Sequence, residues 1–274
     1  RAPRRAARRL PALLRGCELR EAHFERLCTR RAWHALLAGC DTVVNAVGIL
    51  RERGAETYDL VHHRAPAALG AACAFGGRRL IHISALGLHE DAHSGFLTSK
   101  LAGERAIAAS GARYSIVRPS LLDGEGGFGA RWLRWFARWP VHFVPAEARG
   151  RIAVLEVADL GEAIARLCEQ ASDCPEVELG GNAAFTMAEH LARLRGKDTV
   201  QISVAPWLAR ALSHLCDLAH FSPFSYGHLE LLRRDNVPCP NALPRLLGRE
   251  PLAVVRRRDE VFEPAPIALR RPAL

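Results

Sequence analysis

Three short apolar segments of the chain end in small or polar residues that can hydrogen-bond a ligand. Their ends hold Asn45-Ala46-Val47-Gly48, Ser84, and Pro119-Ser120. A further polar segment, Ser94–Lys100, runs directly into a helical pattern. The carboxyl ends of parallel strands meet at one edge of a sheet, and ligands bind there. The sequence therefore predicts a ligand site at that edge, built from these residues.

Strands and helices alternate through the first 170 residues and would position these groups. Runs of β-branched residues predict strands over Thr42–Val47, Arg79–Leu86 and Tyr114–Leu122. Apolar positions at helical spacing predict helices over His62–Phe75 and Lys100–Ser110. Such alternation is typical of βαβ units, so the predicted fold class is α/β with a parallel sheet.

The segments from Ile152 onward contain shorter patterns that predict further strands and helices. Ile152–Val157 predicts another strand, and Asp159 predicts the N-cap of a helix over Leu160–Gln170. Thr186–Arg195 opens with Thr-x-x-Glu, which predicts a helix that begins with a capping box. Beyond Pro206 the pattern is helical and irregular, and the last stretch, rich in Pro and Arg, reads as a poorly ordered tail.

Arg131–Trp139 predicts an aromatic amphipathic helix. Its tryptophans, Trp132, Trp135 and Trp139, fall on one helical face. We expect that face to pack in the core or at a domain interface. A role at a membrane surface or a quinone site is the alternative.

Composition excludes several classes of protein. The 274 residues are 49% hydrophobic and 24% charged, as in an ordinary globular protein. No apolar run approaches the roughly 18 residues that a membrane-spanning helix needs. The net charge of +9 comes from a preference for arginine, since Lys100 and Lys197 are the only lysines. Glutamates and leucines interleave with the arginines of residues 1–31, so a solvated helix face is favoured there over a nucleic-acid-binding arm.

The cysteines and the start of the chain bear on metal binding and location. None of the eight cysteines lies in a CxxC or paired His/Cys spacing, so we expect no metal site. They read as small buried residues in a reducing compartment. No charged-then-apolar signal segment follows Arg1. A cytoplasmic location is therefore expected.

Taken in order, the motifs resemble an extended or atypical short-chain dehydrogenase/reductase. More narrowly, they are similar to the branch that includes the nucleotide-binding accessory subunit of respiratory complex I and its bacterial relatives. The resemblance implies a Rossmann-like parallel sheet, truncated at the N-terminus, in residues 1–170. A smaller, mostly helical substrate or partner region would follow in 171–250, with a tail in 251–274. The matching segments are VVNAVGIL (43–50), HHRAPAALGAAC (62–73), RLIHISALG (79–87), SKLAGE (99–104), IVRPSLLDG (116–124), VADLGEAI (157–164) and LLRRDNV (231–237).

The resemblance also implies catalytic positions. In the superfamily a Ser follows one strand, and a Tyr with a Lys four residues later opens the next helix; the Tyr is the general acid or base. Ser84 and Lys100 match, whereas Phe96 stands at the Tyr position and has no ionisable proton. Tyr58 and Tyr114 lie outside the motif and are the possible substitutes. Cofactor binding does not depend on the phenol.

The resemblance implies a dinucleotide, NADP or NAD, held at the strand ends. The residues implied to bind it are Arg1, Asn45, Ala46, Val47, Gly48, Ser84, Lys100, Pro119 and Ser120. No Gly-rich pyrophosphate motif precedes Arg1, so the chain is expected to start just past the second strand of the fold. Arg1 would then lie beside the adenosine ribose, where a cation favours NADP.

The same alignment makes Cys17–Phe24 the candidate third strand and Thr42–Val47 the fourth. The strand order of this fold is 3-2-1-4-5-6, so two strands would separate them in a complete sheet. Without those strands, Cys17–Phe24 either pairs with Thr42–Val47 or packs on helices with no sheet partner.

The function expected from these residues is NAD(P)(H) binding. The protein would be an oxidoreductase, or a structural or regulatory nucleotide binder that lacks the catalytic Tyr. The alternatives are a non-catalytic interaction scaffold of the respiratory-complex accessory type, and a nucleotide-sugar epimerase or dehydratase. Expected partners are the dinucleotide and either a small-molecule substrate or a protein, with peripheral membrane association left open.

Overall fold

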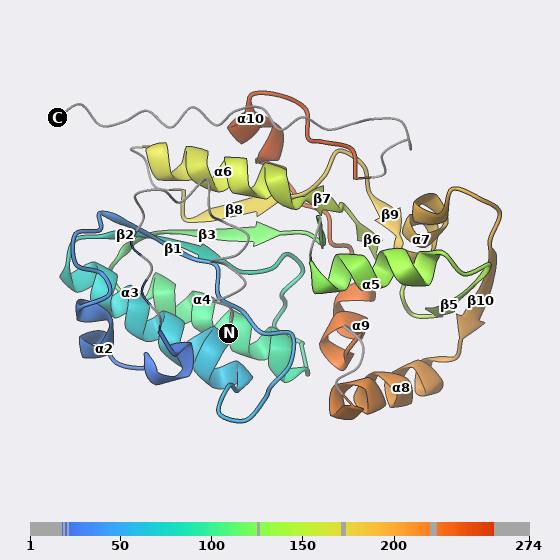
Figure 1. Ribbon diagram of the computed structural model, residues 1–274, viewed down its shortest axis with the longest axis horizontal. Helices are drawn as coiled ribbons and strands as arrows, with labels where there is room; N and C mark the ends of the chain where they lie inside the picture. Colours follow the sequence, from blue (N-terminus) through green and yellow to red (C-terminus); the bar gives the residue numbers. More distant parts are fainter. Residues whose placement is uncertain are drawn as a thin grey trace.

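The structure, a computed structural model, describes residues 18, 20, 22–124, 127–170, 174–219 and 224–254 (Figure 1). Within these residues no helix is long and apolar enough to cross a membrane. The same residues hold no cluster of metal-ligating side chains. Arg1 and Cys17 lie outside the described residues.

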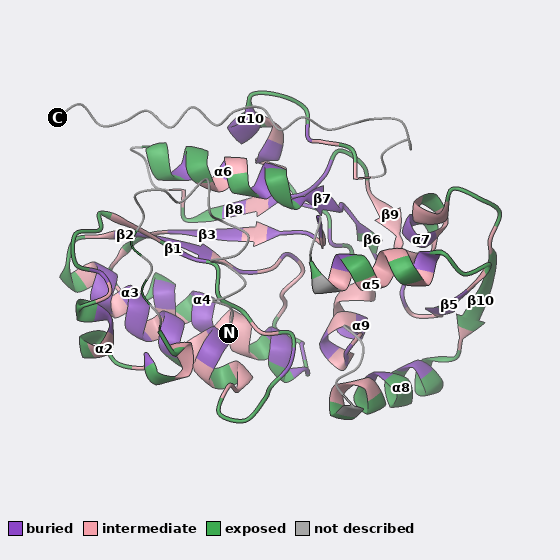
Figure 2. Ribbon diagram, viewed as in Figure 1, coloured by how far each residue is buried: buried purple, intermediate pink, exposed green. Residues whose placement is uncertain are grey.

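A four-stranded parallel sheet forms the centre of the molecule. Its strands are β1 (Thr42–Asn45), β2 (Arg79–Ile83), β3 (Arg113–Pro119) and β8 (Glu176–Leu179), in the order β1-β2-β3-β8. The register pairs Val44 with Ile81. Parallel strands covered on both faces are apolar along their length, and β2 is buried nearly throughout (Figure 2). The predicted parallel α/β sheet is confirmed.

Helices cover both faces of the sheet (Figure 1). On one face lie α2 (Arg30–His34), a π-helical segment (Asp59–Arg64), α3 (Ala65–Phe75) and α4 (Gly95–Ala108). On the other lie α6 (Val157–Glu169) and α10 (Leu243–Leu247). Leu80 packs in the core of the first face and Ile81 in that of the second. Adjacent residues of β2 thus anchor the two layers, since neighbouring side chains of a strand point to opposite faces.

The remaining elements form a smaller part beyond the carboxyl edge of the sheet (Figure 1). Ala137 and Leu191 belong to its own apolar core. Two short strand pairs connect it to the sheet region: β4 (Leu122–Asp123) with β7 (Leu155–Glu156), and β6 (Arg151–Ile152) with β9 (Phe185–Thr186). Its other elements are α5 (Phe128–Ala137), β5 (Val141–Pro145), α7 (Met187–Arg195), β10 (Val200–Val204), α8 (Pro206–Ala219) and α9 (Tyr226–Leu232).

The expected strand over Cys17–Phe24 is wrong where the structure describes it. Residues 22 and 23 are not in a strand, and Phe24–Arg26 is a 3-10 helix. Phe24 packs edge-on against Trp33 with ring centroids 5.3 Å apart. The aromatic contact draws this segment onto α2, and among the described residues β1 pairs only with β2.

The predicted strand over Ile152–Val157 is also corrected. It divides into β6 and β7, and Val157 begins α6. Asp159 is not the N-cap of that helix, because Glu156 occupies that position. The Asp159 carboxylate is fully buried and accepts hydrogen bonds from Arg249 Nη2 (2.7 Å) and the Leu252 backbone N–H (2.6 Å). Asp159 therefore fixes a later segment of the chain to α6.

The capping box at Thr186 is confirmed: Thr186 Oγ1 accepts from the Glu189 N–H, and Glu189 Oε2 accepts from the Thr186 N–H. The expectation of buried cysteines is wrong for most of those described, and Cys73 alone among them is buried. Trp135 and Trp139 are more than half exposed, so the aromatic face of α5 is not packed as core.

Candidate functional site

A cavity of about 570 Å³ lies at the carboxyl ends of β1, β2 and β3. Side chains of α4, α5 and α9 complete its walls. Most of its lining is apolar, as in ordinary small-molecule sites. It collects most of the residues predicted for the site: Ala46, Val47, Gly48, Ser84, Phe96, Lys100, Pro119 and Ser120. Asn45 is buried behind this lining.

The helix start at Ser94 places Phe96 and Lys100 in the cavity. Ser94 Oγ accepts a hydrogen bond from the Leu97 N–H, so α4 begins at Gly95. Residues four apart lie on one helical face, and Lys100 Nζ is 5.6 Å from the centroid of the Phe96 ring. That is a cation–π distance. Phe96 and Lys100 therefore come together at the cavity, as predicted, and Phe96 presents a benzene ring that has no hydroxyl group.

Two polar groups at the cavity have no hydrogen-bond partner among the described residues. Ser84 Oγ is buried and makes no hydrogen bond within the described residues. Lys100 makes neither a hydrogen bond nor an ion pair with any of them. A buried hydroxyl group is nearly always hydrogen-bonded, so Ser84 Oγ is suited to bind a ligand's acceptor atom, and the half-buried Lys100 ammonium can do the same.

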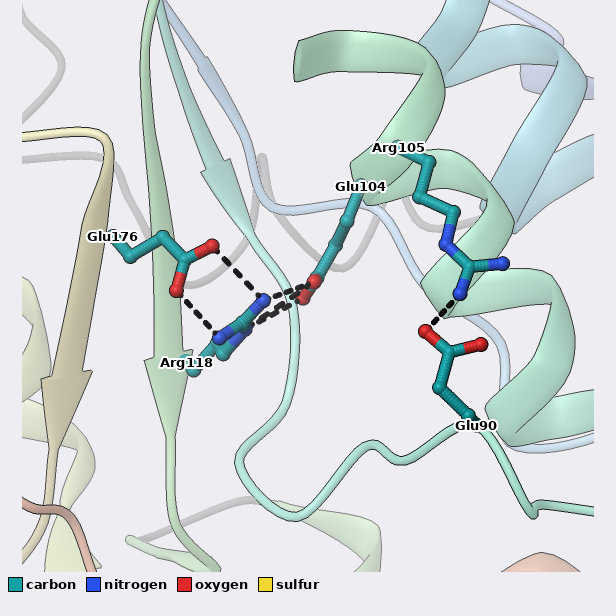
Figure 3. Close-up of polar contacts among 5 residues, drawn as sticks. All are labelled: Glu90, Glu104, Arg105, Arg118 and Glu176. Atoms are coloured by element: carbon teal, nitrogen blue, oxygen red, sulfur yellow. Dashed lines mark hydrogen bonds and ion pairs between the residues drawn. The ribbon is translucent and has the colours of Figure 1, made fainter.

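Burial lowers the pKa of Lys100 to about 8, and the charge of Glu104 partly opposes this shift. Glu104 is engaged elsewhere: its Oε2 accepts from Arg118 Nη2 at 2.6 Å. Arg118 also bonds Glu176 through Nη1 at 2.9 Å, as Figure 3 shows. Because Arg118 lies between the two carboxylates, Glu104 does not hydrogen-bond the lysine.

Asn45 and His82 support the first loop of the cavity. Asn45 Nδ2 donates to His82 Nδ1 (2.9 Å), and Asn45 Oδ1 accepts from the Val47 N–H (3.1 Å). Burial lowers the pKa of His82 to about 3, so the ring is neutral and its Nδ1 is free to accept. The Asn45 side chain therefore shapes the loop Ala46–Leu50, whose backbone lines the cavity.

His62 holds the same loop from the other side. Its Nε2 accepts from the Ile49 N–H (3.1 Å), which leaves Nδ1 to donate to Ser99 Oγ (3.1 Å). Burial lowers the pKa of His62 to about 3. His62 was not identified as a site residue from the sequence, although it lies in the HHRAPAALGAAC motif.

Neither Tyr58 nor Tyr114, the tyrosines outside the motif, is among the residues that line the cavity. The Tyr58 hydroxyl donates to the Leu50 carbonyl (2.9 Å), and burial raises the pKa of Tyr58 to about 12. Its ring packs edge-on against Phe96 with centroids 5.8 Å apart. Tyr114 lies at the amino end of β3, away from the cavity, and packs with the Leu27–Trp33 cluster.

His228 of α9 is a cavity residue that sequence reasoning missed. Its ring stacks on Phe96 with centroids 5.6 Å apart, and its Nδ1 lies 2.6 Å from Ser225 Oγ. Burial lowers the pKa of His228 to about 4, so the ring is neutral near pH 7. No sequence motif marks it, because it reaches Phe96 only through tertiary packing.

Asn236 connects the LLRRDNV segment to two strand ends. Its Oδ1 accepts from Ser120 Oγ (2.6 Å), and its Nδ2 donates to the Leu86 carbonyl (2.7 Å). The Ser120 hydroxyl is thus committed to Asn236, and Ser120 has a supporting role at the cavity.

The described residues fit the nicotinamide end of a dinucleotide. Ser84 Oγ and Lys100 Nζ are donors without a hydrogen-bond partner among the described residues, in a largely apolar space that a dihydronicotinamide ring with its carboxamide could occupy. Arg1, predicted to lie near the adenosine ribose, is outside the described residues.

Comparisons with known proteins point to an NAD(P)H-binding domain in the first half of the chain. Residues 1–133 match the sequence profile of a family described as NAD(P)H-binding. The chain is 30% identical over 143 residues to the ceramide reductase of Caulobacter vibrioides, an alignment covering 52% of this chain and 45% of that protein. It is 32% identical over 116 residues to NADH dehydrogenase [ubiquinone] 1 alpha subcomplex subunit 9, mitochondrial, of Dictyostelium discoideum, covering 41% of this chain and 32% of the relative.

The alignments therefore span less than half of either relative. Among solved structures, the NADPH-dependent quinone oxidoreductase QOR2 of Escherichia coli, in complex with NADPH, superposes with a TM-score of 0.68. The superposition covers 91% of this chain and 85% of that one at 18% identity. A likeness at this identity concerns the fold.

Proposed function

We propose that this chain reduces an apolar carbonyl compound with NAD(P)H. The premise is that residues 1–133 are an NAD(P)H-binding domain of the Rossmann type, with distant homology to the complex I subunit and to ceramide reductase. One observation carries the proposal. Ser84 Oγ and Lys100 Nζ are two hydrogen-bond donors that have no hydrogen-bond partner among the described residues, and both line a largely apolar cavity at the carboxyl edge of the sheet.

Ser84 and Lys100 would act on the carbonyl oxygen. The Ser84 hydroxyl donates a hydrogen bond to that oxygen and orients the carbonyl group. NAD(P)H, when bound, would supply the hydride that the carbonyl carbon accepts. The Lys100 ammonium gives its proton to the same oxygen, which completes the hydroxyl group, and the amine regains a proton from water.

Lys100 suits proton donation because its pKa of about 8 leaves it mostly protonated at pH 7. His228 does not, because a pKa of about 4 leaves almost no imidazolium at that pH. His228 can still orient a substrate by hydrogen bonding through Nε2, which has no partner within the described residues.

The lining supports an apolar substrate. Leu86, Trp132 and Leu231 are among the side chains around the cavity. One relative is named a ceramide reductase, and a lipid-like carbonyl compound would suit the same lining. A nucleotide-sugar reaction has no comparable support, since few polar groups line the cavity.

Phe96 favours a second candidate, a structural or regulatory nucleotide binder without turnover. The two functions share the nucleotide site and differ only in proton transfer. Both functions accommodate NADP or NAD. From the arginines at the start of the chain, we propose that NADP is preferred.

Saturation-transfer NMR with NADPH and NADH tests the shared site, because it detects weak binding and identifies the ligand protons in contact. We expect saturation of the nicotinamide protons in the unsubstituted chain and at least tenfold weaker binding in Lys100→Met. Lys197→Met is the matched control, since Lys197 is the other lysine and is exposed. Equal binding by the two variants would contradict the proposed site.

A further inference from the structure

The helix α8 presents its apolar residues outward. Trp207, Leu215 and Leu218 are 73%, 55% and 80% exposed, whereas Ala209 and Ser213 are buried. Figure 2 shows most of the helix as exposed. A surface helix normally buries its apolar face. The outward face of α8 therefore exposes large side chains that a free soluble surface would not favour.

The neighbouring strand pair has a second exposed apolar face. In the parallel pair β5–β10, Ile202 is paired with Phe143 and Val200 with Val141, so these side chains share one face. Phe143 and Val200 are 57% and 61% exposed. The opposite face carries the buried His142. The face that carries His142 therefore packs against the rest of the protein, whereas Phe143 and Val200 on the outer face are mostly exposed within the described residues.

The two elements that carry these faces are consecutive in the chain. β10 ends at Val204 and α8 begins at Pro206, so a single residue separates them. Together they form what we call the apolar surface, defined by Phe143, Val200, Ile202, Trp207, Leu215 and Leu218. Figure 1 shows both elements on the side of the molecule away from α2 and α3.

The charges beside this surface are mainly positive. Within the described residues, Arg138, Lys197 and Arg210 are exposed and form no ion pair. The nearby acids are neutralised: Glu147 pairs with Arg233 and Asp217 with Arg51. Asp198 remains as the one unpaired acid of segments 141–149 and 197–218 in the described chain. The electrostatic complement of this surface is anionic.

We propose that the apolar surface binds a lipid bilayer that contains anionic lipids. A helix with Trp and Leu on one side and arginine at its margin lies in the plane of the membrane interface, with its apolar side chains inserted among the acyl chains. Exposed cations strengthen such binding through the negative potential of anionic lipids. A second copy of this chain matches the surface less well, since two such faces would bring like charges together.

Flotation of the whole chain with vesicles tests the proposal. We expect it to float with phosphatidylcholine vesicles that contain 30% phosphatidylglycerol, and to bind at least tenfold more weakly to phosphatidylcholine alone or in 1 M salt. Leu215→Glu with Leu218→Glu should weaken binding to the anionic vesicles at least tenfold. Both positions are exposed, so far-UV circular dichroism should show that the variant stays folded.

Phe75→Glu is the matched control, because Phe75 is 71% exposed at the end of α3, away from this surface. It should leave flotation unchanged. Failure of the unsubstituted chain to float with anionic vesicles would overturn the proposal, as would equal losses in the two variants. A concentration-dependent doubling of mass that the α8 variant abolishes, without flotation, would assign the surface to a second copy and also overturn it.

Discussion

At the scale of single residues, the proposed function makes Phe96 the residue that limits how a proton could reach a carbonyl oxygen. Its ring stacks on His228, lies 5.6 Å by its centroid from Lys100 Nζ, and has no proton to give. Lys100 is then the cavity residue with a pKa near neutral pH among those described. Under the proposed function, turnover should follow the titration of Lys100.

We expect Phe96→Tyr to raise the rate of NADPH-dependent reduction of phenanthrenequinone, an apolar dicarbonyl probe, by about 10²-fold or more. Lys100 Nζ lies 5.6 Å from the ring centroid, so the new phenol would have the cation that lowers its pKa beside it. General acid catalysis contributes about 10²–10⁴-fold. Without the substitution, the rate should fall as pH rises through about 8, because Lys100 then loses its proton.

Initial rates between pH 6 and 10 provide the measurement, with Phe96→Leu as the control for a change of ring packing. Equal rates for the Tyr and Leu variants, while NADPH still binds, would favour the structural nucleotide binder. A rate in the unsubstituted chain that stays constant through pH 8 would remove Lys100 as the proton donor.

At the scale of elements, α4 reaches its place in the site through a close approach to the π-helical segment. A Cβ on Gly103 would lie 1.9 Å from the His62 carbonyl oxygen. His62 is also the residue of the π-helical segment whose ring accepts a hydrogen bond from the Ile49 N–H. Any separation of the two elements would therefore displace both Lys100 and the loop that His62 supports.

Gly103→Ala should lower the free energy of unfolding by about 2–4 kcal/mol, because backbone must move to relieve the clash. The gain in helix propensity, about 1 kcal/mol, is smaller. Gly161→Ala in α6 is the matched control: nothing lies within 4 Å of its added Cβ, so it should be stabilising. Urea unfolding measures both, and equal effects of the two substitutions would contradict the packing argument.

The elements also show what the sequence could predict. The strands ending near Asn45, Ser84 and Pro119 were predictable, because buried parallel strands are continuous apolar runs. Their convergence with Lys100 followed from the topology of the sheet. The contribution of His228 was not predictable, since a contact between α9 and α4 depends on how the smaller part folds back over the sheet edge. The 3-10 helix at Phe24–Arg26 likewise depends on its contact with Trp33.

At the scale of the whole molecule, three histidines of the site region link its stability to pH. Burial lowers the pKa of His62 and His82 to about 3 and that of His228 to about 4. All three are neutral in the folded chain near pH 5, where an unfolded chain with ordinary histidine pKa values near 6.5 would bind protons. Because the unfolded state then binds more protons, the free energy of unfolding falls as pH drops from about 6.5 toward 4.

In this pH window each histidine adds about 1.4 kcal/mol per pH unit to the slope of the free energy of unfolding against pH. The three histidines together therefore give a slope of about 4 kcal/mol per pH unit. His82→Gln should remove about a third of that slope, because the amide oxygen can still accept from Asn45 but binds no proton. Urea unfolding at pH 6.5, 5.5 and 4.5 measures it, with the exposed His34→Gln as the control. Carboxylate protonation contributes equally to all three chains and cancels in the comparison. Two results would contradict this prediction: a free energy of unfolding that does not change between pH 6.5 and 4.5, or an unchanged slope in His82→Gln. Either result would mean that these rings accept protons while the protein is folded. The loop Ala46–Leu50 would then not depend on their neutral form.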